Sequence, residues 1–279
     1  MASRVLFEEV YAKMKIYVVT HKPVDLQLLA LDKCYSVIRV GQYAREQNGL
    51  LSDAEGNNIA EKNPNYCELT AQYWMWKNDT TSEVIGMCHY RRYFTTHALS
   101  VNPKYFLKEK DAEYFLKTYD AIVPYNQSYC VGAYKKYLSC GYEKDLKTTK
   151  EAIQALYPEY VPFYEKYFEK SASFRLGNML IMKREVFDAY CEWLFNILQY
   201  VEKRTDLSGY SAQEARIYGY LSERLLNVWL FANKVKCKSM RIVNTEEIHN
   251  VTYYGKEILK FIKIYDLIKS LIFRLQYKE

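Results

Sequence analysis

The chain has 279 residues, 49% apolar and 26% charged, with only 10 Gly and 6 Pro, a composition that excludes disordered and fibrous proteins. Its seven cysteines include no C-x-x-C pair, which argues against a disulfide framework or zinc knuckle and favours a reducing cytoplasm. The net charge of +6 is modest, and no apolar run approaches the ~20 residues that cross a bilayer. We expect an N-terminal extension at residues 1–13, one α/β domain at residues 14–250 and a basic helix at residues 251–279.

Predicted strands and helices alternate along the chain. Short β-branched runs predict buried strands at residues 15–20, 36–40, 84–89, 119–124 and 178–183. Helices are expected over residues 63–77, from 102, through much of 142–170, after 183 and from about 211. This alternation predicts a mostly parallel central sheet flanked by helices, with ligands at the carboxyl ends of the strands.

For two of these helices the residue pattern also predicts which side chains cap the helix or face the core. In the helix over residues 63–77, Asn65 is expected as the N-cap and Glu68 as its partner in a capping box. Neighbouring residues point about 100° apart on a helix, so only one of Trp74 and Trp76 is expected to face the core, and either can instead stack on a base or a sugar. The helix from about 211 is expected to turn one apolar row inward: Ile217, Leu221, Leu225 and Val228.

Four polar segments stand at or near predicted strand ends. They are His21-Lys22-Pro23, HYRRYF at residues 89–94, Asn178, and the stretch that begins at Asp206. None contains a G-x-G-x-x-G, a P-loop or a G-x-S-x-G. The sequence therefore argues against a Rossmann dehydrogenase, a P-loop NTPase and an α/β-hydrolase.

Several long motifs occur in order along the chain. They are THKP at 20–23, NPNYCELTAQYWMWKN at 63–78, IGMCHYRRYF at 85–94, YDAIVP at 119–124, GNMLIMKREVFDAYCEWLF at 177–195 and SGYSAQEARIYGYLSERLLNVW at 208–229. Through these motifs nearly all of residues 14–250 resembles a bacterial glycosyltransferase family long described as a domain of unknown function in capsular polysaccharide gene clusters. The resemblance implies a GT-A-like fold and transfer of a hexose, with galactose in pyranose or furanose form expected, from a UDP-sugar to a surface or capsular polysaccharide.

The donor site that this resemblance implies lacks the usual metal ligands. GT-A enzymes place an Asp-x-Asp after the fourth strand, where it holds Mn²⁺ or Mg²⁺ against the donor diphosphate, and this chain contains no D-x-D. His89, Arg91 and Arg92 stand in the matching place, and an extended segment would point His89 and Arg91 one way and Arg92 the other. Arginines can clamp phosphate without a metal, so no cofactor is expected. The alternatives are an Arg–carboxylate pair beside a packed histidine, and His89 as a ligand of an atypical metal site.

Three further residues are candidates for donor binding. Because GT-A enzymes contact the nucleotide base and ribose at the end of the first strand, His21 is expected to contact ribose or uracil and Lys22 a phosphate. A solvated turn is the alternative for both. Asn178 begins NMLI, which is faintly similar to the N-x-G-x-x-L-I strand of retaining glycosyltransferases of the glycogenin and lipopolysaccharide galactosyltransferase type.

The catalytic candidates are carboxylates within the last of these polar segments, which begins at Asp206. An inverting transfer needs a carboxylate base to take the proton of the acceptor hydroxyl. Asp206, Glu214 and Glu223 are the candidates, and Asp206 and Glu214 are the two proposed for it. Asp206 can instead be a turn residue, and Glu214 can complete a capping box with Ser211. The sequence leaves open whether the transfer is inverting or retaining.

Neighbouring residues are assigned to the acceptor side. Tyr210, Gln213 and Arg216 are expected to contact the acceptor, sugar hydroxyls or phosphate. Glu223 points away from the apolar row of its helix, and an ion pair with Arg216 or Arg224 is its simplest explanation.

The C-terminal residues 256–279 carry six basic and three acidic residues, which is half of the net charge. On a helical wheel the basic residues gather in one stripe: Lys256, Lys260, Lys263, Arg274 and Lys278. The rest of the wheel is mostly apolar, a pattern typical of helices that lie in an anionic membrane interface. We therefore expect a cytoplasmic protein on the inner face of the plasma membrane, where lipid-linked oligosaccharide acceptors are found. Docking on the chain's own domain or on a second copy, as in a homodimer, is the alternative.

Two other functions remain beside the enzyme. One is a non-catalytic carbohydrate-binding or scaffold protein of a glycan assembly complex. The other is an RNA-associated protein, which is disfavoured because the sequence has no RNP-type motif and no strongly basic domain. No nucleic-acid partner is expected.

Overall fold

The computed structural model describes residues 14–24, 32–46, 49–97, 102–128 and 131–246. Its strands are β1 (Met14–Thr20), β2 (Tyr35–Arg39), β3 (Leu51–Ser52), β4 (Val84–His89), β5 (Arg92–Thr95), β6 (Ala121–Pro124), β7 (Gln127–Ser128), β8 (Ser173–Phe174), β9 (Leu180–Lys183) and β10 (Cys237–Asn244). Its α-helices are α1 (Asn63–Tyr66), α2 (Leu69–Asn78), α3 (Glu109–Leu116), α4 (Gly132–Tyr137), α5 (Glu143–Leu156), α6 (Val161–Tyr164), α7 (Arg184–Glu202) and α8 (Ile217–Ala232). The expected extension at residues 1–13 and the basic helix at residues 251–279 lie outside the described residues.

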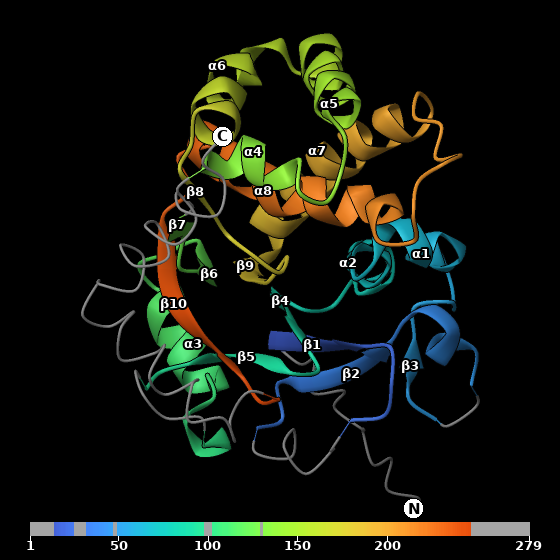
Figure 1. Ribbon diagram of the computed structural model, residues 1–279. Helices are drawn as coiled ribbons and strands as arrows, with labels where there is room; N and C mark the ends of the chain where they lie inside the picture. The colour runs from blue at the N-terminus through green and yellow to red at the C-terminus, as the bar shows by residue number, and fades with distance from the viewer. Residues whose placement is uncertain (1–13, 25–31, 47–48, 98–101, 129–130, 247–279) are drawn as a thin grey trace, which may run out of the picture.

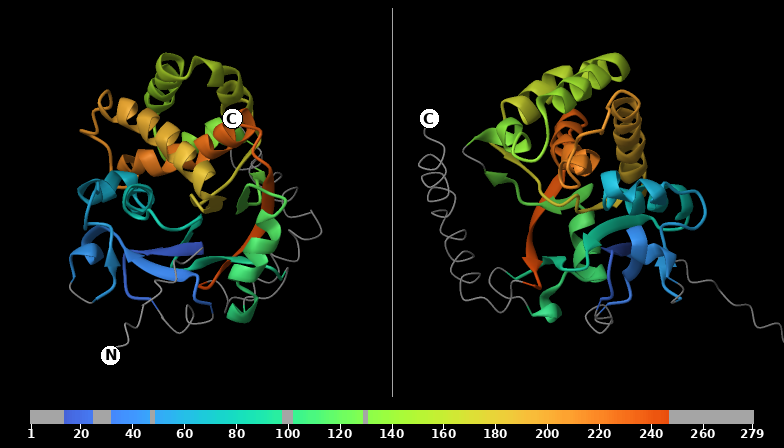
Figure 2. Two further views of the ribbon diagram at one scale, coloured as in Figure 1. Left: turned by 180° about the vertical axis from the view of Figure 1, so that it is seen from behind. Right: turned by 45° about the vertical axis from the view of Figure 1, so that its right-hand side comes forward.

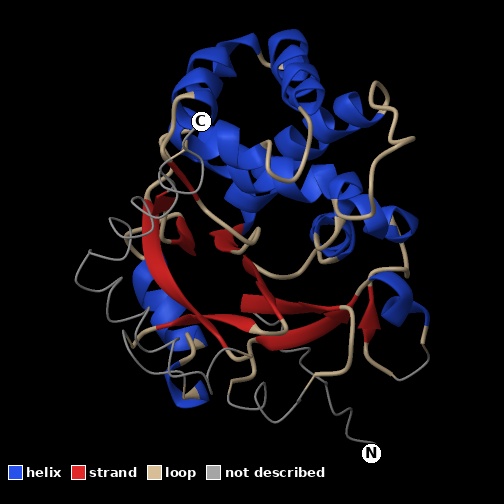
Figure 3. Ribbon diagram, in the orientation of Figure 1, coloured by secondary structure: helices blue, strands red, loops and turns tan. Residues whose placement is uncertain are grey.

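The α/β class is confirmed, but the sheet is mixed rather than mostly parallel. Its order is β3-β2-β1-β4-β5-β10-β6-β9, and β9 also pairs with β4, so β4, β5, β10, β6 and β9 close into a ring (Figures 1 and 3). Strands β3, β2, β1 and β4 run parallel to one another, as do β6 and β10, whereas β5 and β9 are antiparallel to their neighbours. The mixture arises because the chain reverses directly after β4 and because β9 pairs with both β4 and β6.

Helices cover both faces of this sheet. Successive side chains of a strand point to opposite faces, so Tyr17 and Val19 of β1 enter one core while Ile16 and Val18 enter the other. The larger core is shared with α2, α5, α7 and α8, and the smaller one with α3. Figure 2 shows the upper helical layer and the strands below it from two further directions.

The helix predicted over residues 63–77 is interrupted at Cys67. Cys67 has φ of 53°, a left-handed conformation that is uncommon for a residue other than glycine. Asn63 Nδ2 donates to the Cys67 carbonyl at 2.8 Å. The interruption separates α1 from α2 and gives Glu68 a new position at the start of α2.

The capping box predicted for Asn65 and Glu68 is therefore wrong. The Asn65 amide donates instead to the Ala215 carbonyl at 2.9 Å, and Glu68 Oε1 accepts from Asn178 Nδ2 at 2.9 Å. A capping box needs an unbroken first turn between its two residues, and the backbone at Cys67 removes that turn.

The tryptophans of α2 divide as the helical geometry predicts. Trp74 is buried, with its Nε1 donating to the Glu55 carbonyl at 2.7 Å. Trp76 is half-buried and stacks on Phe195, with ring centroids 5.8 Å apart. Neither tryptophan lines the pocket described below.

The helix predicted from about residue 211 begins later than expected. A 3-10 turn at Glu214–Arg216 leads into α8, whose predicted apolar row from Ile217 to Val228 is buried. Among the helices that the structure describes, none combines the length and the apolar character that spanning a bilayer requires.

Candidate active site

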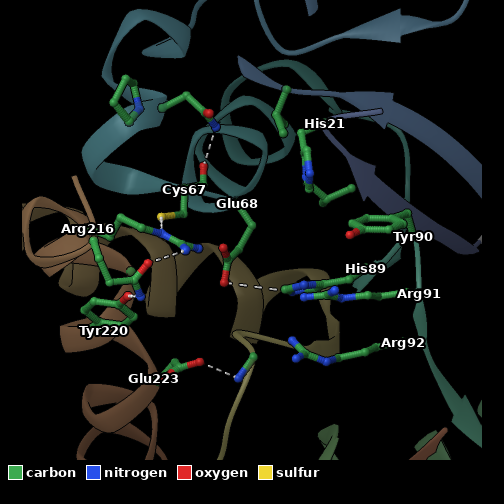
Figure 4. Close-up of a pocket in the computed structure, with 17 residues that line it drawn as sticks. His21, Cys67, Glu68, His89, Tyr90, Arg91, Arg92, Arg216, Tyr220 and Glu223 are labelled. Atoms are coloured by element: carbon green, nitrogen blue, oxygen red, sulfur yellow. Dashed lines mark hydrogen bonds and ion pairs between the residues drawn. The ribbon is translucent and has the colours of Figure 1, made fainter. Parts of the chain in front are cut away.

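A pocket of about 520 Å³ opens at the carboxyl ends of β1 and β4, opposite α1, the start of α2 and α8 (Figure 4). Its size is typical of small-molecule sites. The lining residues are Val19, His21, Val40, Asn63, Pro64, Cys67, Glu68, His89, Tyr90, Arg91, Arg92, Gly177, Gln213, Arg216, Gly219, Tyr220 and Glu223. The sequence-predicted His21, His89, Arg91, Arg92, Gln213 and Arg216 thus meet around one cavity.

A tight β-hairpin places the basic residues of the HYRRYF motif. β4 ends at His89, the chain turns through Tyr90 and Arg91, and Arg92 begins β5 directly opposite His89. Residues directly opposite in an antiparallel pair project from the same face, so His89 and Arg92 share a face. The prediction that Arg92 points away from His89 is wrong, because the segment folds back instead of continuing as one strand.

A cluster at the mouth of the pocket joins His21, Lys22, Tyr90, Arg91 and Glu246. The Glu246 carboxylate accepts from Lys22 Nζ at 3.0 Å and from Arg91 Nη1 at 2.8 Å, and both bonds lower its pKa. His21 packs edge-on against Tyr90 at 5.2 Å between ring centroids. Burial lowers the pKa of His21, and Lys22 and Arg91 lower it further. Lys22 does not line the pocket itself.

His89 lies deeper, beside the Glu68 carboxylate. Its Nε2 is 3.9 Å from Glu68 Oε1 and is buried without a hydrogen-bond partner among the described residues. Burial lowers the pKa of His89, and the positive charge of Arg92 adds to that effect, while Glu68 opposes it. Asn178 lies behind this pair, where its amide bonds Glu68 and the Gly219 carbonyl. A neutral His89 therefore presents an unused ring nitrogen beside the cavity.

Glu223 forms the inner end of the opposite wall. Its Oε1 accepts from the Gly177 backbone N–H at 2.7 Å, and its Oε2 lies 3.6 Å from Arg224 Nη1. Burial raises the pKa of Glu223 to about 7, against the lowering effect of Arg224. The ion pair with Arg224 that the sequence suggested is present, but the side chain also lines the pocket.

Arg92 occupies the floor near Gly177. Its Nη1 would lie 3.8 Å from a Cβ placed on Gly177, and its guanidinium forms no ion pair with any residue of the described ranges. Its charge lowers the pKa of both His89 and Glu223. Arg92 is therefore a cation that lines the pocket and has no paired carboxylate among the described residues.

Polar groups of the loop before α8 complete the outer wall. Arg216 Nε approaches Cys67 Sγ at 3.1 Å, and Gln213 hydrogen bonds to the Tyr220 hydroxyl. Arg216 Nη1 also lies 3.5 Å from Gln213 Oε1. This wall offers amide, guanidinium and phenol groups, which are the groups that bind sugar hydroxyls.

Besides Lys22 and Asn178, three further predicted residues lie outside the pocket lining. Asp206 is exposed, and its carboxylate accepts from the Ser208 backbone and hydroxyl. Glu214 forms the capping box with Ser211, as its alternative explanation required.

Tyr210 is directed to the buried Asp145, to which its hydroxyl donates a hydrogen bond. It does not reach the cavity. The pocket carboxylates are instead Glu68 and Glu223. The sequence analysis favoured a cap for Glu68 and an ion pair for Glu223, and no residue pattern marks the interruption at Cys67 that brings Glu68 to the pocket.

Residues 15–234 match the family described as a domain of unknown function (DUF4422). The chain belongs to this family. Among solved structures, this DUF4422 chain is similar to WbbM, a bifunctional glycosyltransferase in its apo form, with 28% identity and a TM-score of 0.74. The match covers 83% of this chain and 45% of WbbM, so the chain spans less than half the length of that protein.

A second solved structure, the mannosyltransferase Ktr4p from S. cerevisiae, matches with 9% identity and a TM-score of 0.33, covering 78% of this chain and 67% of that one. That TM-score is too low to establish a shared fold. No curated protein matches the chain significantly.

Proposed function

We propose that this DUF4422 chain is a glycosyltransferase with a GT-A-like fold, which moves a hexose from a UDP-sugar to a growing surface or capsular polysaccharide. The observation that carries the proposal is the pocket itself, where the hairpin that bears His89 and the cations Arg91 and Arg92 faces the carboxylates Glu68 and Glu223. The similarity to WbbM supports the reaction class. Galactose, in pyranose or furanose form, is the sugar we propose.

The cations are proposed to receive the donor diphosphate. Arg92 has no carboxylate partner in the described ranges, and Arg91 stands at the mouth of the same pocket. Guanidinium groups bind phosphate oxygens bidentately and stabilise the charge that develops on the leaving UDP. We assign neutralisation of that charge to the two arginines. Among the described residues no three His, Cys, Asp or Glu side chains are placed to hold a metal ion.

The acceptor is proposed to enter along the opposite wall. Gln213, Arg216 and Tyr220 offer hydrogen-bond donors and an aromatic face at the open side of the pocket. A lipid-linked oligosaccharide is the acceptor that we propose, with the basic C-terminal helix binding the inner face of the plasma membrane. That helix lies outside the described residues, and dimerisation through it is the competing proposal.

Binding of UDP is the direct test of this function. We expect UDP, but not AMP, to raise the melting temperature, because the pocket pairs phosphate-binding cations with His21 at the position proposed for the base and ribose. A ligand at about 100 times its Kd contributes about 2.7 kcal/mol, which raises the melting temperature by several degrees. If millimolar UDP leaves the melting temperature unchanged, the donor site is assigned wrongly; UDP binding without hydrolysis of any UDP-sugar would favour the non-catalytic alternative.

The Glu246→Gln variant should bind UDP more tightly than the wild type. Glu246 holds Lys22 and Arg91 in ion pairs that a donor phosphate must replace. Removing its charge removes a carboxylate that competes with the donor phosphate for Lys22 and Arg91, and we expect the Kd for UDP to fall a few-fold by calorimetric titration. Glu61→Gln, an exposed glutamate outside the cluster, is the matched control. Weaker UDP binding in Glu246→Gln would mean that Glu246 orients the cations instead of competing for them.

A further inference from the structure

We propose that Glu223 is the general base of the transfer, the group that takes the proton of the attacking acceptor hydroxyl. The inference rests on the proposed glycosyl transfer. It assigns to α8 a role that the sequence had given to Asp206 or Glu214. Two adjacent loop residues, Gly177 and Asn178, hold both pocket carboxylates.

The loop before β9 fixes the two acids from adjacent residues. The Gly177 N–H donates to Glu223, and the neighbouring Asn178 side chain donates to Glu68. Both loop residues have positive φ, 89° at Gly177 and 47° at Asn178. Glycine adopts this conformation without strain, and asparagine adopts it more readily than most other residues. The carboxylates are thus held at the cavity from opposite helices by adjacent residues.

Glu223 is anchored by a backbone N–H, and its ion pair with Arg224 is longer than a hydrogen bond. Gly177 occupies its Oε1 at 2.7 Å, while the nearest cation, Arg224 Nη1, stands 3.6 Å from Oε2. Arg224 is itself buried and committed elsewhere, since the same Nη1 donates to the Tyr220 carbonyl at 2.7 Å. The carboxylate therefore keeps its basicity while its position is fixed.

The charged groups around Glu223 set its protonation. Burial raises its pKa to about 7 and the nearby Glu68 acts in the same direction, while Arg224, the Gly177 N–H and Arg92 act in the other. A base is most effective when its pKa lies near the working pH. Glu223 is ionised above about pH 7 and protonated below it, so activity that depends on it falls as the pH drops through 7.

The second pocket carboxylate, Glu68, is already held by a neighbouring side chain. It stands directly before Leu69, the first residue of α2. Its Oε1 already accepts from Asn178 and lies 3.9 Å from His89 Nε2. Glu68 is therefore already engaged by Asn178, and the acceptor proton is assigned to Glu223.

The step that Glu223 serves is a single displacement. The acceptor oxygen forms a bond to the anomeric carbon of the sugar while the bond from that carbon to the donor phosphate oxygen breaks. The electron pair of the broken bond goes to the UDP diphosphate, beside Arg92. The hydroxyl proton passes to the Glu223 carboxylate, and the product has inverted anomeric configuration.

Hydrolysis of the donor tests the assignment without knowledge of the acceptor, because water is then the attacking hydroxyl. UDP release is measured from UDP-galactopyranose and UDP-galactofuranose. Glu223→Gln keeps an oxygen for the Gly177 N–H and should slow release at least about 100-fold while retaining the thermal shift with UDP. Glu192→Gln, an exposed glutamate of α7, Asp206→Asn and Glu214→Gln should match the wild type. In the wild type, kcat/KM should fall below about pH 7, a limb that Glu223→Gln should lack.

Azide provides a second readout in Glu223→Ala. Azide attacks the anomeric carbon without losing a proton, so it should restore UDP release and yield a glycosyl azide of inverted configuration. Release from Glu223→Gln within twofold of the wild type would overturn the assignment, as would Glu223→Ala binding UDP without rescue by azide. A wild-type profile flat between pH 5.5 and 8.5 would do so independently of how any variant folds. A wild type that neither binds UDP nor releases it would instead overturn the proposed function, and the inference with it.

Discussion

The Arg92→Ala variant should turn over its UDP-sugar about 100-fold more slowly than the wild type, in a reaction that survives EDTA. Arg92 faces the pocket beside Gly177 and has no carboxylate partner among the described residues, so its charge is available to the leaving diphosphate. Loss of one preorganised transition-state contact of this kind costs about 3 kcal/mol, or ~100-fold in rate. The measurement is UDP release with and without EDTA; Arg91→Ala should act in the same direction.

Arg204→Ala is the matched control for this variant. Arg204 is exposed and stacks on Tyr200, outside the pocket lining, so its loss removes an equal charge without touching the site. Its rate should equal that of the wild type. If chelation abolished the wild-type reaction and Mn²⁺ restored it, a metal rather than the arginines would neutralise the donor.

The Asp145→Ala variant should lose about 3 kcal/mol of unfolding free energy, because several groups depend on this one buried carboxylate. Asp145 is fully buried and accepts from the Tyr137 hydroxyl at 2.9 Å, the Tyr142 backbone N–H at 2.9 Å and the Tyr210 hydroxyl. Alanine leaves these donors without their acceptor. For a domain of this size the melting temperature should drop by about 6–12 °C in a thermal scan.

Glu143→Ala is the control for that substitution. Glu143 also lies in the first turn of α5 but is exposed, so its removal should leave the melting temperature nearly unchanged. Equal melting temperatures for Asp145→Ala and the wild type would contradict the role given to this carboxylate. They would also return the Tyr210 hydroxyl to the candidates for acceptor contact.

Local sequence patterns predicted the elements of the fold better than their pairing. The β-branched run at residues 15–20 and the apolar run at 84–89 became β1 and β4, because a strand buried on both faces is apolar along its whole length. The strand β10 was not predicted, and its pairing with β5 and β6 depends on residues far apart in the chain. A mixed sheet therefore could not be distinguished from a parallel one by periodicity alone.

The sequence also predicted only part of the candidate site. Strand-end reasoning brought His21, His89 and Arg92 to one cavity, since parallel strands end at a common edge. Strand-end reasoning did not find Glu68. That residue reaches the pocket because the backbone of Cys67 is left-handed, and nothing in the sequence indicates this conformation at a cysteine.

The ring of strands has a consequence for synthesis of the chain on the ribosome. The cationic hairpin between β4 and β5 is held on its far side by β10, through Arg92 opposite Asn244 and the Thr245 N–H bonded to the Arg91 carbonyl at 2.8 Å. Contacts between residues so distant in sequence form late, after local structure. The nascent chain thus exposes the unpaired edges of β5 and β6 until its residues up to about 245 have left the exit tunnel. We expect a truncation before β10 to aggregate, and the donor pocket to assemble only as the closing step of folding.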